Sequence, residues 1–146
     1  MQVRPSISLR GFSKLSKTRQ QEQDLSPRDK FIAAARRHKL LSNKCSRCGH
    51  LMLATVYYCE KCFGQKFETI ELEGTGKVVT YTIQAVAPEG FEDAGSYAWV
   101  IFSVDGTDFR VSGFLPGVTS SSDLPLGSRV RVLDYHPKHG LTLQKI

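Results

Sequence analysis

Two features of the sequence predict a mainly β protein with an N-terminal helix, a small cysteine-rich module and a five-stranded barrel. The four cysteines occur as two Cys-x2-Cys pairs separated by ten residues. After Gly74, short segments of β-branched and aromatic residues alternate with glycine-containing turns, as is typical of all-β domains. A chain of 146 residues, 40% of them hydrophobic, can hold one domain of ordinary size and one small module.

Residues 1–25 are predicted to form a flexible basic arm, because their polar, serine-rich composition leaves apolar side chains too sparse to pack. The first twenty residues contain no acidic residue, so a mitochondrial transit peptide, a partner-binding tail and an overextended start site all fit the composition. These residues lack the apolar core of a secretory signal. No run of 18 apolar residues that could span a membrane is present in the sequence.

Residues 26–42 are predicted to form the N-terminal helix. Ser26 can cap it, Pro27 suits its first position, and Asp29 is spaced to reach back to the N–H of the cap. Its narrow apolar stripe consists mainly of Phe31, Ile32 and Ala35. Two interpretations remain open: the stripe packs on the cysteine-rich module of the same chain, or it docks on another protein.

Residues 43–70 contain every cysteine of the chain: Cys45, Cys48, Cys59 and Cys62. Each pair can form a tight turn with both thiolates on one side, and two such turns supply the four ligands of a tetrahedral zinc ion at about 2.3 Å. Four sulfurs close the coordination sphere, so the ion would be structural. The alternative, a disulfide, needs an oxidising compartment, and the short spacing gives poor bridge geometry. The sequence therefore predicts a rubredoxin-like zinc ribbon in a cytoplasmic protein.

The ribbon is expected to contain a small hairpin between its two cysteine pairs, within the β-prone segment from Leu51 to Tyr58, and a third strand at Lys66–Ile70. So small a module cannot bury enough apolar surface by itself. The metal must therefore stabilise it.

Residues 71–146 are predicted to form the barrel. Asp105-Gly106 suits a hairpin turn between the second and third strands, and Trp99, Phe102 and Phe109 lie in apolar strands and are expected in the core. Five short strands with one loop of about fifteen residues are typical of an OB-fold barrel, although an SH3-like barrel has the same periodicity. The five predicted strands are Lys77–Ala85, Tyr97–Val104, Phe109–Gly113, Arg129–Tyr135 and Leu141–Lys145.

The positive charge of the chain is concentrated at its beginning. Residues 1–50 carry twelve lysines and arginines against three acidic residues, a net charge of +9, whereas residues 51–146 carry eight against eleven, a net charge of −3. Nucleic-acid binding is the rival function, because both zinc ribbons and OB barrels perform it. It requires a cationic groove, which the barrel segment lacks, so it would have to depend on the first 50 residues.

The sequence contains no self-contained catalytic motif. The four histidines do not accompany a nucleophile or a pair of carboxylates, so we expect no catalytic residue and no enzyme activity of the chain alone. They are His38, His50, His136 and His139, of which His50 is interpreted as a turn residue beside a cysteine pair.

The ordered set of motifs resembles a known family. A Ser-Pro-led basic helix, CSRCGH and CEKC, then GTGKVVTYT, YAWVIFSVDG and LGSRVRV over residues 27–146 are similar to the zinc-ribbon plus OB-fold proteins associated with acyl-CoA enzymes, long classed as a domain of unknown function. Many members have a Pro-Pro-Arg run where this chain has Leu53–Tyr58, and a Pro-Tyr where it has Ser96-Tyr97. Residues 1–25 lie outside the resemblance.

The resemblance implies a non-catalytic scaffold subunit. In archaeal members, such a subunit bridges acetoacetyl-CoA thiolase and HMG-CoA synthase of the mevalonate pathway of isoprenoid biosynthesis, and other members pair with thiolases, aldolases or hydratases. We therefore expect a hetero-oligomer, with Phe31 and Ile32 as apolar anchors and Arg36 and Arg37 steering an acidic partner face. The phosphates of a coenzyme A at a shared site are the alternative target of these arginines.

Overall fold

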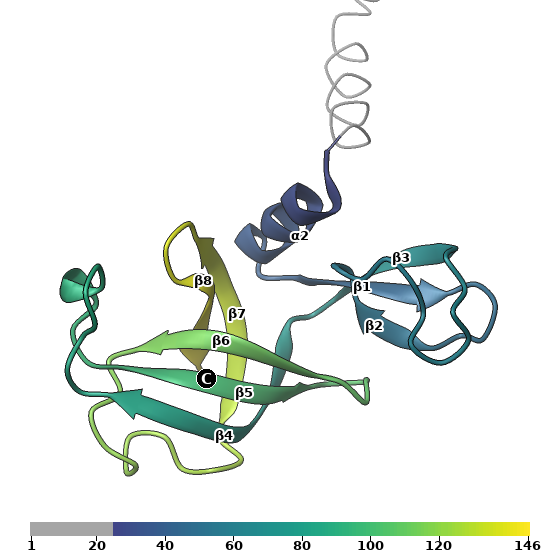
Figure 1. Ribbon diagram of the computed structural model, residues 1–146. Helices are drawn as coiled ribbons and strands as arrows, with labels where there is room; N and C mark the ends of the chain where they lie inside the picture. Colours follow the sequence, from purple (N-terminus) through teal and green to yellow (C-terminus); the bar gives the residue numbers. More distant parts are fainter. Residues whose placement is uncertain (1–24) are drawn as a thin grey trace, which may run out of the picture.

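The computed structural model describes residues 25–146, so the predicted basic arm and its transit-peptide alternative lie almost wholly outside the described residues. The described part forms one α-helix, one 3-10 turn and eight strands (Figure 1). No helix in this part is long and apolar enough to cross a membrane. The elements are α2 Pro27–Arg36, β1 Leu40–Cys45, β2 Leu51–Leu53, β3 Phe67–Leu72, β4 Thr75–Gln84, η2 Glu92–Ala94, β5 Tyr97–Val104, β6 Arg110–Pro116, β7 Arg129–His136 and β8 Gly140–Lys145.

The helix begins as the sequence predicts but ends earlier. The Ser26 hydroxyl accepts the backbone N–H of Asp29 at 3.2 Å and donates to the Asp29 carboxylate at 2.6 Å, so Asp29 binds the cap side chain rather than its N–H. The helix stops at Arg36 instead of continuing through residue 42, because His38 adopts a left-handed backbone with φ of 63°. The chain then enters β1.

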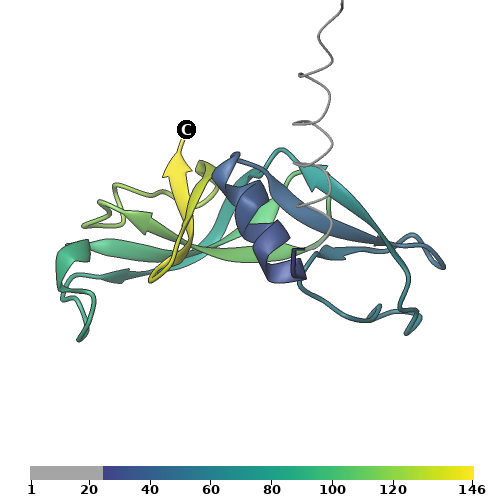
Figure 2. The ribbon, with the colours of Figure 1, turned by 90° about the horizontal axis from the view of Figure 1, so that it is seen from above.

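The apolar stripe of α2 is used inside the chain. Phe31 is only 7% exposed and meets Tyr135 of β7 edge to face, with ring centroids 6.4 Å apart. Ala34 and Ala35 are fully buried in the same core. Figures 1 and 2 show α2 between the barrel and the three-stranded sheet. The expectation that Phe31 anchors a partner is therefore corrected, because its ring already fills a site in this chain's own core.

The three-stranded sheet has the order β2-β1-β3, with both pairings antiparallel. Only Leu51–Leu53 of the predicted hairpin segment forms a strand. Its partner is Leu40–Cys45, where the sequence predicted helix through residue 42 and the start of the ribbon, without a strand, from residue 43. Phe67–Leu72 matches the expected third strand with a shift of one or two residues. Buried Ser42 on the central strand donates to the carbonyl of Met52 at 2.8 Å.

All five predicted barrel strands are present and close into a barrel of order β4-β5-β6-β8-β7, with β4 pairing back to β7. Every pairing is antiparallel except the short parallel contact between β6 and β8. Phe102, Val100, Val130, Val132 and Leu143 fill the interior and are essentially inaccessible to solvent. The mainly β fold class with a five-stranded barrel is confirmed.

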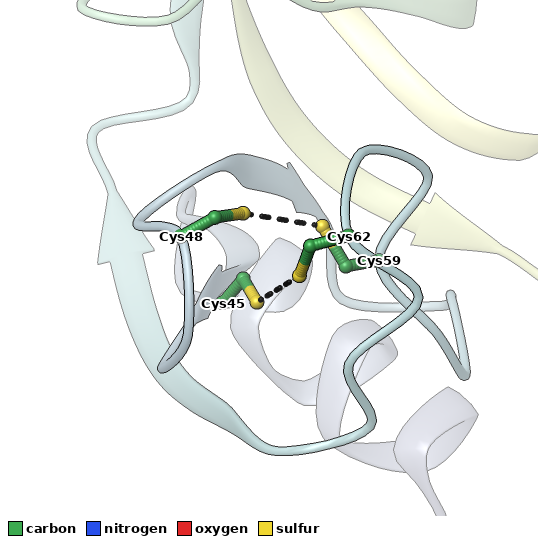
Figure 3. Close-up of side chains that lie close together, drawn as sticks. All are labelled: Cys45, Cys48, Cys59 and Cys62. Carbon is green, nitrogen blue, oxygen red and sulfur yellow. Dashed lines mark hydrogen bonds between the residues drawn. The ribbon is translucent and has the colours of Figure 1, made fainter.

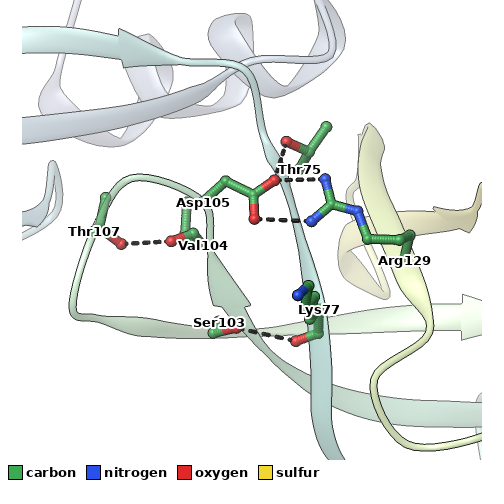
Figure 4. Close-up of polar contacts among 7 residues, drawn as sticks. All are labelled: Thr75, Lys77, Ser103, Val104, Asp105, Thr107 and Arg129. Carbon is green, nitrogen blue, oxygen red and sulfur yellow. Dashed lines mark hydrogen bonds and ion pairs between the residues drawn. The ribbon is translucent and has the colours of Figure 1, made fainter.

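Two expectations for the barrel have different outcomes. The Asp105-Gly106 turn between β5 and β6 is confirmed, and Asp105 is held there by Arg129 and Thr75 (Figure 4). Trp99 was expected in the core, but its position on β5 points outward and it is 37% exposed. Alternation along a strand explains the difference, since Ala98 and Val100 on either side of Trp99 take the inward positions.

Candidate metal centre

The first cysteine pair lies where β1 ends. The N–H of Cys45 donates to the carbonyl of His50 at 2.9 Å, and the N–H of Gly49 donates back to the carbonyl of Cys45 at 2.9 Å. These two bonds close a tight turn around Cys48. Gly49 has φ of 75°, a left-handed conformation that glycine adopts without steric cost.

The second pair repeats this turn bond for bond. The N–H of Cys59 donates to the carbonyl of Gly64 at 2.8 Å, and the N–H of Phe63 donates to the carbonyl of Cys59 at 2.8 Å. Phe63 therefore occupies the position that Gly49 holds in the first turn, and its φ of 60° is likewise left-handed. For a bulky side chain this conformation costs about 1 kcal/mol.

The two turns bring all four sulfur atoms together (Figure 3). The four Sγ atoms lie within 4.8 Å of one another, and the pairs Cys45–Cys62 and Cys48–Cys59 are each separated by 3.5 Å. All four cysteines are free thiols. Sulfurs that surround a tetrahedral zinc ion at about 2.3 Å would be ~3.8 Å apart. The cluster therefore fits a four-coordinate metal ion with little rearrangement.

Backbone groups favour the thiolate form at two of these positions. The N–H groups of Cys48 and Arg47 lower the pKa of Cys45 to about 6, against the opposing effect of burial. Burial raises the pKa of Cys59, but the N–H groups of Cys62 and Lys61 lower it overall. At Cys48 the N–H of His50 lowers the pKa, yet burial and the three neighbouring sulfurs raise it to about 12. Four thiolates at this separation repel one another, and a bound cation removes that repulsion.

Two further residues support the cluster. Gly64 leaves room beside it, since a Cβ there would lie 3.3 Å from the sulfur of Cys62 and 3.5 Å from that of Cys45. His50 was interpreted as a turn residue, but its Nε2 lies 2.6 Å from a carboxylate oxygen of Glu60 and so links the two cysteine turns. Sequence reasoning missed this pair, because the partners are ten residues apart and no local pattern joins them.

The predicted partner-binding residues lie on α2 or, for Arg37, at its C-cap, and do not contribute to the metal centre. Arg36 is exposed at the last turn, and Arg37 pairs with Glu71 of β3. Ile32 is partly buried. A second ion pair in this region joins Lys39 to Glu73, with 2.7 Å between Nζ and the carboxylate oxygen. These contacts tie the basic end of the helix to the sheet that precedes the barrel.

A second cluster missed by sequence reasoning lies beside the turn that joins β7 to β8. The His139 ring stacks on Phe114 at 4.4 Å and on His136 at 4.4 Å, and Phe91 lies 4.9 Å away. His139 Nδ1 is buried and has no hydrogen-bond partner among the described residues. Burial, followed by the charges of His136 and Lys138, lowers the pKa of His139. The strand pattern gave no signal for this cluster, since it joins a loop, a strand and a turn.

The remaining histidine contacts have structural explanations. His38 Nδ1 lies 2.7 Å from the carbonyl of Leu133, which joins the end of α2 to β7. His136 Nδ1 accepts the backbone N–H groups of Lys138 and His139 at 3.1 and 3.3 Å. Both histidines therefore hold turns in place.

A helix, a four-cysteine ribbon and a closed five-stranded barrel define the class of ribbon–barrel proteins with an OB-fold. Residues 69–133 match the family described as "ChsH2, C-terminal OB-fold domain". Two relatives are each named "DUF35 domain-containing scaffold protein". The one from Methanocaldococcus jannaschii is 34% identical over 84 residues, 53% of this chain and 60% of the relative, and the one from Pyrococcus furiosus is 36% identical over 56 residues, 38% of this chain and 40% of the relative.

Within that class, the chain is similar to OB-fold proteins of the DUF35 family. Two solved structures share its fold. "Ltp2-ChsH2(DUF35) aldolase" superimposes with a TM-score of 0.61 at 21% identity over 79% of this chain and 91% of the other. A DUF35 protein of unknown function from Sulfolobus solfataricus superimposes with a TM-score of 0.58 at 19% identity, over 94% of this chain and 99% of the other. The matched segments span less than two thirds of either scaffold relative.

Proposed function

We propose that the chain is a non-catalytic, zinc-binding scaffold subunit of an acyl-CoA enzyme complex in the cytoplasm. The observation that carries the proposal is the match of residues 69–133 to the ChsH2 OB-fold domain, together with relatives named as scaffold proteins. The enzymes we propose as partners are acetoacetyl-CoA thiolase and HMG-CoA synthase of the mevalonate pathway, in a hetero-oligomer. Four thiols kept free for a metal suit a reducing compartment.

The cysteine cluster supports zinc as the bound ion. Four thiolate sulfurs in a compact group are the ligand set that zinc takes in structural sites, and they leave no open position for a substrate or a water molecule. The ion would hold the two cysteine turns together and add nothing to the chemistry of a partner enzyme.

The contacts of the histidines support a non-catalytic role. His38 and His136 bind backbone groups, His50 binds Glu60, and His139 is packed between aromatic rings. A general base must reach a substrate proton, and these four side chains are already occupied or enclosed. We retain three proposed partner contacts on α2 and its C-cap: Ile32, Arg36 and Arg37.

A second candidate partner is an aldolase. One of the structures that shares this fold is named "Ltp2-ChsH2(DUF35) aldolase", and a scaffold of the same fold could support such an enzyme. Nucleic-acid binding is the weaker alternative, because the segment from residue 51 onward has a net charge of −3 and would repel phosphates.

Co-expression of the full chain with the thiolase and HMG-CoA synthase of the same organism tests the proposal. We expect the three proteins to elute together from a sizing column and the thiolase to gain activity or solubility. The chain alone should show no turnover of acyl-CoA substrates. Separate elution of all three, or turnover by the isolated chain, would contradict the proposal, and co-elution with a host aldolase instead would favour the second candidate.

A further inference from the structure

The ribbon exposes three aromatic side chains on the second cysteine turn, which we name the knuckle patch: Tyr57, Tyr58 and Phe63. Their side chains are 77%, 57% and 74% exposed. The rings of Tyr58 and Phe63 stack with centroids 6.4 Å apart. Aromatic side chains with so much accessible surface are unusual on a free protein and are enriched in protein interfaces.

Phe63 is the most informative of the three. The matching position of the first turn is Gly49, and the two turns have the same pair of backbone hydrogen bonds. A glycine would serve the second turn without strain, yet the chain places an exposed aromatic residue in a left-handed conformation there. The turn itself does not require this side chain, whose only ring contact among the described residues is the stack on Tyr58. Its role is therefore to be sought in what it contacts outside the chain.

Two grooves adjoin the knuckle patch. A groove of about 390 Å³ is lined by Tyr57 and Tyr58 together with Leu51, Leu53 and Phe109, and so runs from the ribbon to the start of β6. A second groove, of about 520 Å³, is lined by Phe63 with Arg47 and Lys66. An apolar partner surface can thus contact the rings and fill the space beside them.

The charged side chains around the patch that form no ion pair are positive. Arg47, Lys61 and Lys66 take part in no ion pair among residues 25–146, whereas Glu60, the acidic residue of the same turn, is bound to His50. An apolar patch with a cationic rim is complementary to an apolar surface with carboxylates around it.

We propose that the knuckle patch docks the chain onto its partner enzyme, at an apolar protein face rimmed by acidic side chains. The inference rests on the proposed scaffold function and moves the main contact from α2, whose apolar side is buried, to the second cysteine turn. A protein face is favoured over RNA because the groove beside the tyrosines is lined mainly by apolar and aromatic residues, and because residues 51–146 have a net charge of −3.

Binding of the full, zinc-loaded chain to the thiolase and to the HMG-CoA synthase of the same organism tests the inference. The variants are Phe63→Gly and the double variant Tyr57→Ser with Tyr58→Ser. Val86→Ser and Leu126→Ser remove exposed apolar side chains elsewhere, 84% and 69% accessible, and serve as matched controls. We expect the patch variants to bind at least about ten-fold more weakly and the controls to bind as the original chain does.

Thermal unfolding and zinc content separate docking from folding. Phe63→Gly removes a strained residue, so its melting temperature and zinc content should equal or exceed those of the original chain while its affinity falls. A purely structural Phe63 would give the opposite result, a lower melting temperature. Replacing Lys61 and Lys66 with glutamine should flatten the dependence of affinity on salt.

The outcomes that overturn the inference are distinct. If the original chain binds an enzyme and the patch variants bind it equally well, the patch is not the docking site and the scaffold function stands. If the original chain binds neither enzyme, the proposed function fails for these partners and the inference fails with it. If the original chain binds a labelled single-stranded RNA and Phe63→Gly does not, the partner is RNA and the inference of a protein face is wrong. If the original chain is a dimer and Phe63→Gly is a monomer, the patch binds a second copy of the chain instead of an enzyme.

Discussion

Arg129 and Asp105 form an ion pair through two hydrogen bonds, of 2.8 and 2.6 Å, which joins the turn after β5 to the first residue of β7 (Figure 4). Thr75 at the start of β4 donates its hydroxyl to the same carboxylate at 2.7 Å. Three segments far apart in the sequence thus meet at one acidic side chain. The hydrogen bonds from Arg129 and Thr75 lower the pKa of Asp105 to about 2.

Asp105→Asn should destabilise the protein slightly at neutral pH and not at all in strong acid. The carboxylate is favoured in the folded state, so its contribution is present above about pH 4, the ordinary value, and disappears as the pH falls towards 2. Because both side chains are about two fifths exposed, we expect a loss below about 1 kcal/mol. Urea unfolding at pH 7 and pH 2.5 measures it, with Asp108→Asn as an exposed control in the same hairpin. An equal loss of stability at both pH values would contradict the predicted coupling between protonation of Asp105 and folding.

Gly76→Ala should be strongly destabilising. A Cβ at this position would lie 2.0 Å from the carbonyl oxygen of Ser103 and 2.7 Å from the ring of Phe102. Both neighbours belong to the paired strand β5 and cannot move aside, so we expect a loss of roughly 3 kcal/mol. Gly117→Ala is the control, since it has positive φ but open space around it and should cost only about 1 kcal/mol. Chemical denaturation measures both variants. Equal losses of stability in the two would refute the close approach of β5 to Gly76.

Phe31→Ala should lower the stability of the folded chain by about 3 kcal/mol, because it leaves a cavity between α2 and Tyr135. Ile32→Ala, a partly exposed neighbour on the same helix, should cost clearly less. Thermal unfolding compares the two variants. If Phe31→Ala left the stability unchanged but weakened partner binding, the original expectation of an external anchor would be restored.

Cys59→Ser should abolish stoichiometric zinc binding and unfold the ribbon while the barrel persists. Binding of the ion supplies the folding free energy of the ribbon, whereas most of the main buried core belongs to the barrel strands. Metal analysis checks the first part, and amide hydrogen exchange of Val100 and Phe102 against that of Met52 checks the second. Undiminished zinc in the variant, or simultaneous loss of protection in both regions, would disprove this prediction.

His139→Phe should make stability less dependent on pH between about pH 7 and pH 5. In the native protein, burial disfavours the charged imidazole, so the unfolded chain binds more protons below about pH 6.5 and stability falls as the pH is lowered. Phenylalanine keeps the stack on Phe114 and removes the titration. Melting temperatures across this range measure the effect, with His38→Gln as a comparison. A slope unchanged by the substitution would show that His139 is not responsible.

Local spacing along the chain was enough to predict several features. Two Cys-x2-Cys pairs predicted a four-sulfur cluster because each tight turn places its own thiols, and the strands at 97–104 and 129–136 followed from their β-branched and aromatic residues. The Ser26-Pro27 start of α2 was equally local. These features need no knowledge of what lies across the fold.

The other features depend on contacts that form only in the folded protein. The end of α2 depends on a left-handed His38, the burial of Phe31 depends on Tyr135 more than one hundred residues later, and the outward position of Trp99 depends on which face of β5 turns to the core. The equivalence of Gly49 and Phe63 appears only when the hydrogen bonds of both turns are compared. Each of these depends on contacts between segments distant in the chain, and the pattern of residues around any one segment does not carry that information.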